Sequence, residues 1–383
     1  MTEADKEGQR KAPILRFKGF NDDWEQRKLG EIGKVRSCKR IYRNQTSNIG
    51  EIPFYKIGTF GKEADSFISR ELYEEYKEKF SFPQVGDVLI SASGTLGRIV
   101  TYSGENAYFQ DSNIVWLDND NHLALNKYLE IYYQRIHWKA SEGSTIKRLY
   151  NSDIEKTIIS IPKRDEQSKI SEYLKLLNKV IALYERKLKL LSQVKKYCLD
   201  NLFTEKEYPN LRFKGFTDAW EQRKLEDIVE KIGTGKSNFK KSKKDIKNIF
   251  PILGSTSIIG YDSSYDYDGN FILTARVGNA GNLYKYCGKA KISDNTIYIQ
   301  SNEIEFSFPL LMHNNLKKLS FGSGRSLIKS SELKKYKVTI PNKNEKECIG
   351  NIFYLLDNLI TLYENKKQNI IKIKKELLNT MFI

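Results

Sequence analysis

A stretch of fifteen residues occurs twice in this chain of 383 residues. The first copy, residues 15–29, reads LRFKGFNDDWEQRKL, and the second, residues 211–225, reads LRFKGFTDAWEQRKL. Thirteen of the fifteen positions are identical, at an offset of 196 residues. This period is too long for a solenoid repeat and has the right length for two domains. The chain is therefore expected to contain two modules of one fold, each opening with the repeated stretch.

Within the repeated stretch, aromatic side chains are expected to pack inward and basic side chains to stay in water. The expected inward residues of the first copy are Phe17, Phe20 and Trp24, and the expected exposed ones are Arg16, Lys18, Arg27 and Lys28. The simplest interpretation is a structural element that both modules use in the same way.

Short β-type runs bounded by turn residues follow each copy of the stretch. In the first module they are residues 52–58, 87–91, 99–102 and 157–161, with a glycine-rich loop at 93–98. In the second module they are residues 250–254, 270–276 and 338–341, with glycines at 278 and 281. Apolar residues at helical spacing also predict a helix over 123–137. The modules agree in framework and differ in much of what lies between, as expected of one scaffold with two different recognition surfaces.

A long helix is predicted after each module. Residues 165–203 contain no glycine or proline, and residues 162–203 align without a gap to residues 341–382 at an offset of 179. Apolar residues recur every seven positions in both segments, which is typical of a coiled coil. The heptad residues expected at the interface of a helix pair are Ile170, Leu177, Tyr184, Leu191, Ile349, Leu356, Tyr363 and Ile370. A helix of about 39 residues would be roughly 58 Å long, which suits a spacer rather than the interior of a small domain.

The net charge of +16 and the pI of about 9.3 indicate an anionic partner. Nucleic acid is the first candidate and an acidic membrane surface the second. The charged N-terminal residues do not resemble a signal peptide, and no run of 18 apolar residues occurs, so a cytoplasmic protein without a membrane span is expected. Four scattered cysteines and three histidines favour reduced thiols and no structural metal site.

The spacing of residues in the sequence matches no catalytic motif. Gly233 to Ser237 has the look of a phosphate loop, but Glu230 stands where the first glycine is required. The histidines show no pairing that favours acid–base or nucleophilic catalysis. We therefore expect a chain without a catalytic site, metal or cofactor of its own.

The pattern as a whole resembles the specificity subunits of type I restriction-modification systems. Each module opens with Trp-x-x-x-x-Leu, at Trp24 to Leu29 and at Trp220 to Leu225, and closes with a strand, a proline and a long helix. Residues 161–170, IPKRDEQSKI, are similar to the start of the conserved helix in that family, whereas the second copy has Lys346 in place of the glutamine. The resemblance extends over the chain from about residue 15 and rests on the architecture more than on any single motif.

The resemblance implies an α+β fold in which two β-rich target recognition domains are held apart by two antiparallel helices, with an internal pseudo-two-fold repeat. It implies that each domain reads one half of a split sequence in double-stranded DNA. It also implies a non-catalytic subunit that joins two methyltransferase subunits, which use S-adenosylmethionine, and restriction/translocase subunits, which use ATP and Mg. The expected segments are a disordered lead at 1–14, the recognition domains at 15–162 and 211–341, the helices at 163–203 and 342–383, and a linker at 204–210.

Base-contacting residues cannot be transferred by motif, so candidates are chosen by chemistry. Arginine and asparagine read base edges with two hydrogen bonds, whereas lysine mostly meets phosphate. Polar and basic residues on the glycine-bearing loops are therefore the candidates for DNA contact, with ordinary solvated loops as the alternative. They are Ser93, Thr95, Arg98, Lys147 and Arg148 in the first module, and Arg276, Asn279, Arg325 and Lys329 in the second, with Lys240, Lys241, Lys243 and Lys244 expected on phosphates.

Two other functions stay open at this point. A single-chain restriction enzyme would need nuclease and methyltransferase motifs that the residue spacing does not supply. A coiled-coil structural or membrane-surface protein would not need two divergent β-rich modules with glycine loops. Salt-dependent binding to DNA, compared with binding to anionic vesicles, separates these functions.

Overall fold

The computed structural model describes residues 12–138, 148–236, 239–277, 281–319 and 328–382. Most of the expected lead at 1–14 lies outside these residues. The chain divides into two compact units. The first unit comprises Met1–Ala182 with Gln368–Ile383, and the second comprises Leu183–Lys367. Each long helix contributes residues to both units.

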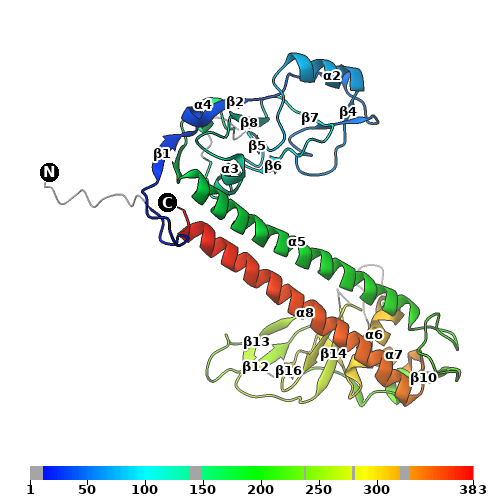
Figure 1. Cartoon of the computed structure of the whole chain (residues 1–383). Coiled ribbons are helices and arrows are strands. Elements are labelled where there is room, and N and C mark those ends of the chain that lie inside the picture. The colour runs from blue at the N-terminus through cyan, green and yellow to red at the C-terminus, as the bar shows by residue number, and fades with distance from the viewer. Residues whose placement is uncertain (1–11, 139–147, 237–238, 278–280, 320–327, 383) are drawn as a thin grey trace. The chain divides into compact units, whose positions relative to one another are not determined.

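The first unit combines small sheets with short helices and the start of a long helix (Figure 1). In chain order its elements are β1 (Glu25–Lys28), α1 (Leu29–Ile32), β2 (Gly33–Arg36), η2 (Arg43–Gln45), β3 (Ile52–Tyr55), β4 (Phe67–Ile68), α2 (Arg70–Lys79), β5 (Val88–Ser91), β6 (Ile99–Thr101), β7 (Tyr108–Phe109), β8 (Ile114–Asn119), α3 (Asn126–Tyr133), α4 (Asn151–Glu155), β9 (Ile158–Ile161) and α5 (Arg164–Asn201), which ends in the second unit. The described strands form sheets in the orders β1-β9, β2-β8-β5-β6 and β4-β3-β7.

The second unit is built in the same way. Its elements are β10 (Glu221–Lys224), η3 (Leu225–Asp227), β11 (Lys231–Thr234), β12 (Phe250–Leu253), β13 (Ile258–Asp262), β14 (Asn270–Ala275), β15 (Leu283–Cys287), β16 (Lys291–Ile292), β17 (Thr296–Gln300), α6 (Ile304–Asn314), η4 (Leu316–Leu319), α7 (Ser330–Lys335), β18 (Lys337–Ile340) and α8 (Lys343–Thr380), which ends in the first unit. The described strands form sheets in the orders β10-β18, β11-β17-β14-β15 and β13-β12-β16.

The sheets of the second unit repeat the strand order of the first. In each unit one pair of strands in the three-stranded sheet is parallel, β3 with β7 and β12 with β16. The other strand pairs among the described residues are antiparallel. Both units therefore have one topology, although the sequences between the repeated stretches differ.

The central strands of the four-stranded sheets are buried on both faces. In β5, Ile90 packs into the core that includes Leu129 of α3, whereas Leu89 packs into the core of the three-stranded sheet. In β14, Ile272 and Leu273 point to different cores in the same alternating way. Because each strand is covered on both sides, its sequence is a continuous apolar run instead of an alternating one.

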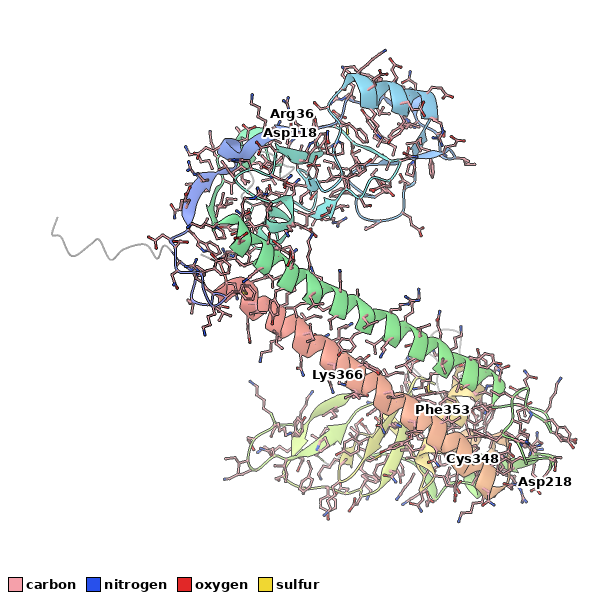
Figure 2. The ribbon with its side chains drawn as sticks, in the orientation of Figure 1. Arg36, Asp118, Asp218, Cys348, Phe353 and Lys366 are labelled. Atoms are coloured by element: carbon pink, nitrogen blue, oxygen red, sulfur yellow. The ribbon has the colours of Figure 1, made fainter. Side chains whose placement is uncertain are left out.

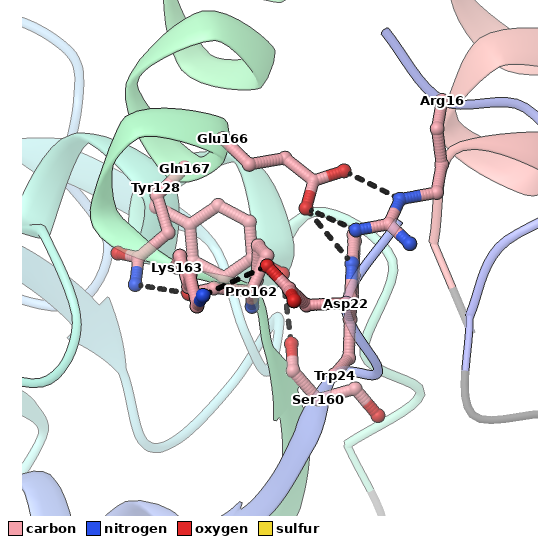
Figure 3. Close-up of polar contacts among 9 residues, drawn as sticks. All are labelled: Arg16, Asp22, Trp24, Tyr128, Ser160, Pro162, Lys163, Glu166 and Gln167. Atoms are coloured by element: carbon pink, nitrogen blue, oxygen red, sulfur yellow. Dashed lines mark hydrogen bonds and ion pairs between the residues drawn. The ribbon is translucent and has the colours of Figure 1, made fainter. Parts of the chain in front are cut away.

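An ion pair fastens the first repeated stretch to the start of α5 (Figure 3). The carboxylate of Glu166 accepts hydrogen bonds from Nε and Nη2 of Arg16, at 2.8 and 2.7 Å, and from Nε1 of Trp24 at 3.2 Å. The Glu166 side chain is 2% exposed and that of Arg16 is 12% exposed. The expectation that Arg16 stays in water is therefore wrong, because a buried carboxylate needs its charge. The expectation for Trp24 is confirmed, since it is buried.

The second unit contains the same arrangement. Glu345, at the start of α8, accepts from Nε and Nη2 of Arg212, both at 2.8 Å, and from Nε1 of Trp220 at 3.3 Å. In both units the acidic side chain lies in the first turn, where the positive end of the helix dipole also favours a carboxylate. The repeated stretch is thus a clamp that fixes each module to the helix that follows it.

The two long helices are confirmed at Arg164–Asn201 and Lys343–Thr380. Just beyond α5, Phe203 packs in the second unit against Phe306 and against Phe353 of α8, with ring centroids 5.8 and 5.7 Å apart. Phe353 is labelled on α8 in Figure 2. Beyond α8, Phe382 packs in the first unit against Trp24 and Tyr132, at 6.1 and 5.5 Å. Each unit therefore holds the beginning of one long helix and the end of the other.

Several helices differ from expectation, and the longer ones have identifiable reasons. The predicted helix over 123–137 is shorter, because the Asn121 carboxamide accepts from the backbone N–H of Asn126 at 2.7 Å and keeps the preceding residues in a turn. Helix α2 was not predicted, although the Ser69 hydroxyl caps it by accepting from Leu72 N at 3.3 Å. Helix α6 was not predicted either, since it is apolar on most sides and contains Pro309.

Candidate nucleic-acid interface

The glycine-rich loop of the first unit is held tightly by its own hydrogen bonds. The Ser91 hydroxyl donates to the Thr95 carbonyl at 2.5 Å and accepts from the backbone N–H of Arg98 at 2.8 Å. Gly97 has a φ of +74°, and a Cβ there would lie 2.1 Å from the Trp138 ring. Only glycine fits this close approach. The loop is consequently a fixed turn at the end of β5.

Several predicted DNA contacts of this loop have partners inside the protein. Ser93 is buried, and its hydroxyl lies 2.8 Å from Oδ1 of Asn113. Arg98 Nη1 donates to the Phe60 carbonyl at 2.9 Å, and Arg148 Nη2 donates to the Ser112 carbonyl at 3.1 Å. The backbones of Ser93 and Arg148 form a β-bridge, so the structure brings these two predicted residues together.

Two further residues predicted to contact DNA in the first unit are Thr95 and Lys147. Thr95 is exposed at the tip of the loop. Lys147 lies outside the described residues. The contact of this loop with DNA stays a prediction, and the guanidinium groups that support neighbouring carbonyls have fewer donors left for bases.

The corresponding loop of the second unit carries an exposed arginine. Arg276 follows β14, and its backbone N–H donates to the Asn295 carbonyl at 2.9 Å. Its carbonyl accepts from the N–H of Ile328 at 3.0 Å, which places the exposed Lys329 next in the chain. Asn279 and Arg325 lie outside the described residues. Arg276 and Lys329 thus come from segments that the fold brings together.

The four predicted phosphate-contacting lysines, Lys240, Lys241, Lys243 and Lys244, are all exposed. Their segment is anchored by backbone bonds: Lys240 N donates to Asp262 Oδ2 at 2.8 Å, and Ser242 exchanges two bonds of 3.0 Å with Tyr261. Among the described residues no carboxylate forms an ion pair with these lysines. Lys241, Lys243 and Lys244 line a groove of about 640 Å³ together with β13.

Asp245, the acidic residue within this basic run, accepts hydrogen bonds from its own turn. Backbone N–H donation from Asn248, together with the Asn248 side chain and Lys247 N, holds the pKa of Asp245 below its usual range. The carboxylate therefore stabilises a turn and leaves the lysines uncompensated, which suits an anionic ligand.

The predicted helix-pair residues lie in two places. Ile170, Leu177 and Ile370 belong to or pack against a core of the first unit, and Leu191, Ile349 and Leu356 to a core of the second. In the second unit, Tyr184 of α5 contacts Tyr363 of α8 with ring centroids 5.8 Å apart. Further along, Lys195 of α5 pairs with Asp357 of α8.

Sequence reasoning passed over the segment of the first unit that follows β2. Arg43, Asn44 and Asn48 are exposed there, close to Lys39 and Arg40. Three basic residues and two asparagines within ten positions were the signal that could have identified it.

Other kinds of site receive no support from the described part of the chain. It contains no group of three or more His, Cys, Asp or Glu side chains able to hold a metal ion. No described helix is long and apolar enough to cross a membrane. Gly233 and Thr234 lie in strand β11, so they do not form a phosphate-binding loop.

The sequence matches the family model for the "Type I restriction modification DNA specificity domain" over residues 21–193 and 217–372. A putative type I restriction enzyme specificity subunit of Haemophilus influenzae is 61% identical over 142 residues, which are 37% of this chain and 37% of that relative. The putative type I restriction enzyme MjaX specificity subunit of Methanocaldococcus jannaschii is 22% identical over 399 residues, covering 94% of this chain and 93% of the relative.

Solved structures are similar in fold. The S subunit of a type I restriction-modification system from M. genitalium matches with a TM-score of 0.65 at 15% identity, over 97% of this chain and 99% of that chain. A structure concerning complex assembly and conformational transition of a type I R-M system matches with a TM-score of 0.51 at 13% identity, over 94% of this chain and 97% of that one.

Proposed function

Because this chain belongs to the family of type I restriction-modification specificity subunits, we propose that each of its two modules reads one half of a bipartite DNA target. The main support for this proposal is that both units have the same topology but expose different segments. A glycine loop and an amide-rich turn occur in the first unit, where the second unit has exposed Arg276 and a lysine run. This combination of equal framework and unequal surface suits a target whose two halves differ in sequence.

The long helices would set the distance between the two modules as an antiparallel pair. In the second unit the contacts run in opposite chain directions: Tyr184 and Lys187 meet Tyr363, and Lys195 meets Asp357. Each heptad stripe is too narrow to remain unpaired in water. The clamps at Glu166 and Glu345 would transmit this spacing to the modules.

The chain would act without catalysing a reaction, and its partners would supply the chemistry. Strands β1 and β10 both read Glu-Gln-Arg-Lys, and every residue of both is exposed. Packing alone does not require identical exposed side chains, so these strands are suited to two copies of one partner. We propose two methyltransferase subunits that use S-adenosylmethionine, joined by restriction/translocase subunits that use ATP and Mg. Methylation or cleavage of DNA by the purified chain would instead favour a single-chain enzyme.

Exchange of residues 30–160 for the same module of a relative tests the proposal. The exchanged protein is expected to prefer a new sequence in one half of the target and the original sequence in the other, because each module carries its own reading surface. Selection of bound DNA from a library with both halves randomised measures this. A change in both halves would show that the modules do not read independently.

Replacement of Lys240, Lys241, Lys243 and Lys244 by alanine is expected to weaken binding to all DNA sequences alike. The slope of log affinity against log salt should fall by roughly 0.9 for each phosphate that a lysine no longer neutralises. The control changes four other exposed lysines of the second unit, namely Lys206, Lys334, Lys335 and Lys343. Equal slopes for both variants would mean that the run contributes only general charge.

A further inference from the structure

The segment that follows the first strand of the four-stranded sheet occupies an equivalent place in each unit. In the first unit it runs from β2 to β3, and in the second from β11 to β12. Ser47 exchanges two backbone bonds of 2.9 Å with Phe67 of β4, and Ser242 exchanges two of 3.0 Å with Tyr261 of β13. Because β4 and β13 hold the same position in the sheet order, residues 39–48 and 239–247 are counterparts.

Each of these segments borders a groove. In the first unit a groove of about 510 Å³ lies between Asn44 to Gly50 and the residues at the start of α2. In the second unit the groove of about 640 Å³ lies between the lysine run and β13. The counterparts differ in chemistry: the first segment contributes amide and hydroxyl side chains to its groove, and the second contributes ammonium groups.

The turn in the first unit is rigid and presents its side chains outward. The backbone N–H of Tyr42 donates to Oε1 of Gln45 at 2.8 Å, and the hydroxyl of Thr46 donates to the Arg43 carbonyl at 2.9 Å. Gln45 Nε2 also lies 3.4 Å from the Tyr76 hydroxyl of α2. These bonds fix the backbone of the short helix η2 while Arg43 and Asn44 remain exposed.

Arg43, Asn44 and Asn48 make no side-chain hydrogen bond or ion pair with any other residue that the structure describes. The Arg98 and Arg148 guanidinium groups, in contrast, donate to backbone carbonyls. Arg43 therefore keeps its full set of donors, and Asn44 keeps a donor and an acceptor.

The acidic neighbours of this segment are mostly paired. Asp111 accepts from Arg40 Nε at 2.9 Å, and Glu51 accepts from Arg70 Nε at 2.9 Å. Glu71 lies in the first turn of α2. Bonding to its own backbone N–H and to Ser69 lowers the pKa of Glu71, so its negative charge is retained at the edge of the groove. Glu51 and Glu71 line the groove, whereas Arg43 lies next to it in the chain, so an approaching anion is favoured at Arg43 over the groove itself.

We propose that residues 39–48 and 239–247 are counterpart DNA-contacting elements with different tasks. The first reads base edges of double-stranded DNA through Arg43 and Asn44, and the second holds phosphates through its lysines. Arginine pairs with two acceptors of guanine and asparagine with the donor and acceptor of adenine, whereas an ammonium group meets phosphate as a point charge. This inference rests on the proposed function and places base reading in a segment separate from the glycine loop.

Full-length Arg43→Ala and Asn44→Ala variants test the inference. Each variant is bound to a DNA library with both half-sites randomised, and base preferences are compared with those of the wild-type chain. We expect preference at one or two positions of one half-site to fall by roughly 10-fold or more, because alanine cannot form the two hydrogen bonds to a base edge. Preferences in the other half-site should stay unchanged. Lys62→Ala, an exposed basic residue elsewhere in the first unit, is the control.

The outcomes distinguish a failure of this inference from a failure of the proposed function. Wild-type preferences at every position in both variants would overturn the inference while the proposed function stands. A uniform loss of affinity with a lower salt slope would also overturn it, since Arg43 would then contact phosphate. A wild-type chain that prefers no sequence would overturn the proposed function, and the inference with it.

Discussion

Replacement of Glu166 by alanine is expected to lower the free energy of unfolding of the first unit by about 3 kcal/mol. The Arg16 guanidinium would keep its charge at a site where its side chain is 12% exposed. The indole N–H of Trp24 would lose its acceptor as well. Removal of one partner from a buried pair is costly because the other charge stays buried without compensation. Urea unfolding followed by circular dichroism measures the change.

Glu172→Ala is the matched control on the same helix. Glu172 accepts from Lys127 Nζ at 2.9 Å, but its side chain is 69% exposed. An exposed pair of this kind contributes about 0–1 kcal/mol. Equal shifts in the unfolding midpoint for the two variants would show that the clamp at Glu166 does not fasten the module.

The corresponding change in the second unit, Glu345→Ala, should have an effect of similar size. Arg212 and Trp220 bind Glu345 in the same way, and the carboxylate is 1% exposed. The agreement between the units explains why the repeated stretch keeps its arginine and its tryptophan: both side chains bind the glutamate at the start of the following helix.

The periodic parts of the structure could be predicted from the sequence. The two long helices lie within a few residues of their predicted bounds, because a heptad repeat without helix breakers has few other folds. The central strands β5 and β14 were also identifiable, since apolar runs bounded by turn residues are typical of buried strands.

The non-periodic parts could not be predicted in the same way. Arg16 looks like any surface arginine, and only the fold places it beside Glu166, which is 150 positions away in the chain. The glycine loop was a reasonable candidate for DNA contact by composition, but Ser93 and Arg98 have partners in the fold that no spacing indicates. Counterpart segments such as 39–48 and 239–247 share little sequence, so their equivalence is visible only in strand pairing.

Lengthening both helices by one heptad is expected to change the preferred gap between the two half-sites. Seven residues inserted after Leu188 in α5, and seven between Asp357 and Tyr363 in α8, fall in facing parts of the two helices, because Tyr184 and Lys195 contact Tyr363 and Asp357 respectively. A heptad keeps each apolar stripe in phase. The clamps and the reading surfaces are unchanged by the insertion.

The size of the expected change follows from the rise per residue of an α-helix and the rise per base pair of DNA. Seven helical residues add roughly 10 Å at 1.5 Å per residue, and DNA advances about 3.4 Å per base pair, so the optimum gap should grow by about three base pairs. The added twist of the DNA weakens binding by an amount that depends on the spacer, so the position of the optimum is the quantity to measure, with a library of spacer lengths. Insertion into α5 alone is the control, since it shifts one stripe against the other and should broaden or abolish the optimum. If the double insertion leaves the optimum where it is in the wild-type chain, the helices do not set the spacing and the proposed arrangement of the two modules is wrong.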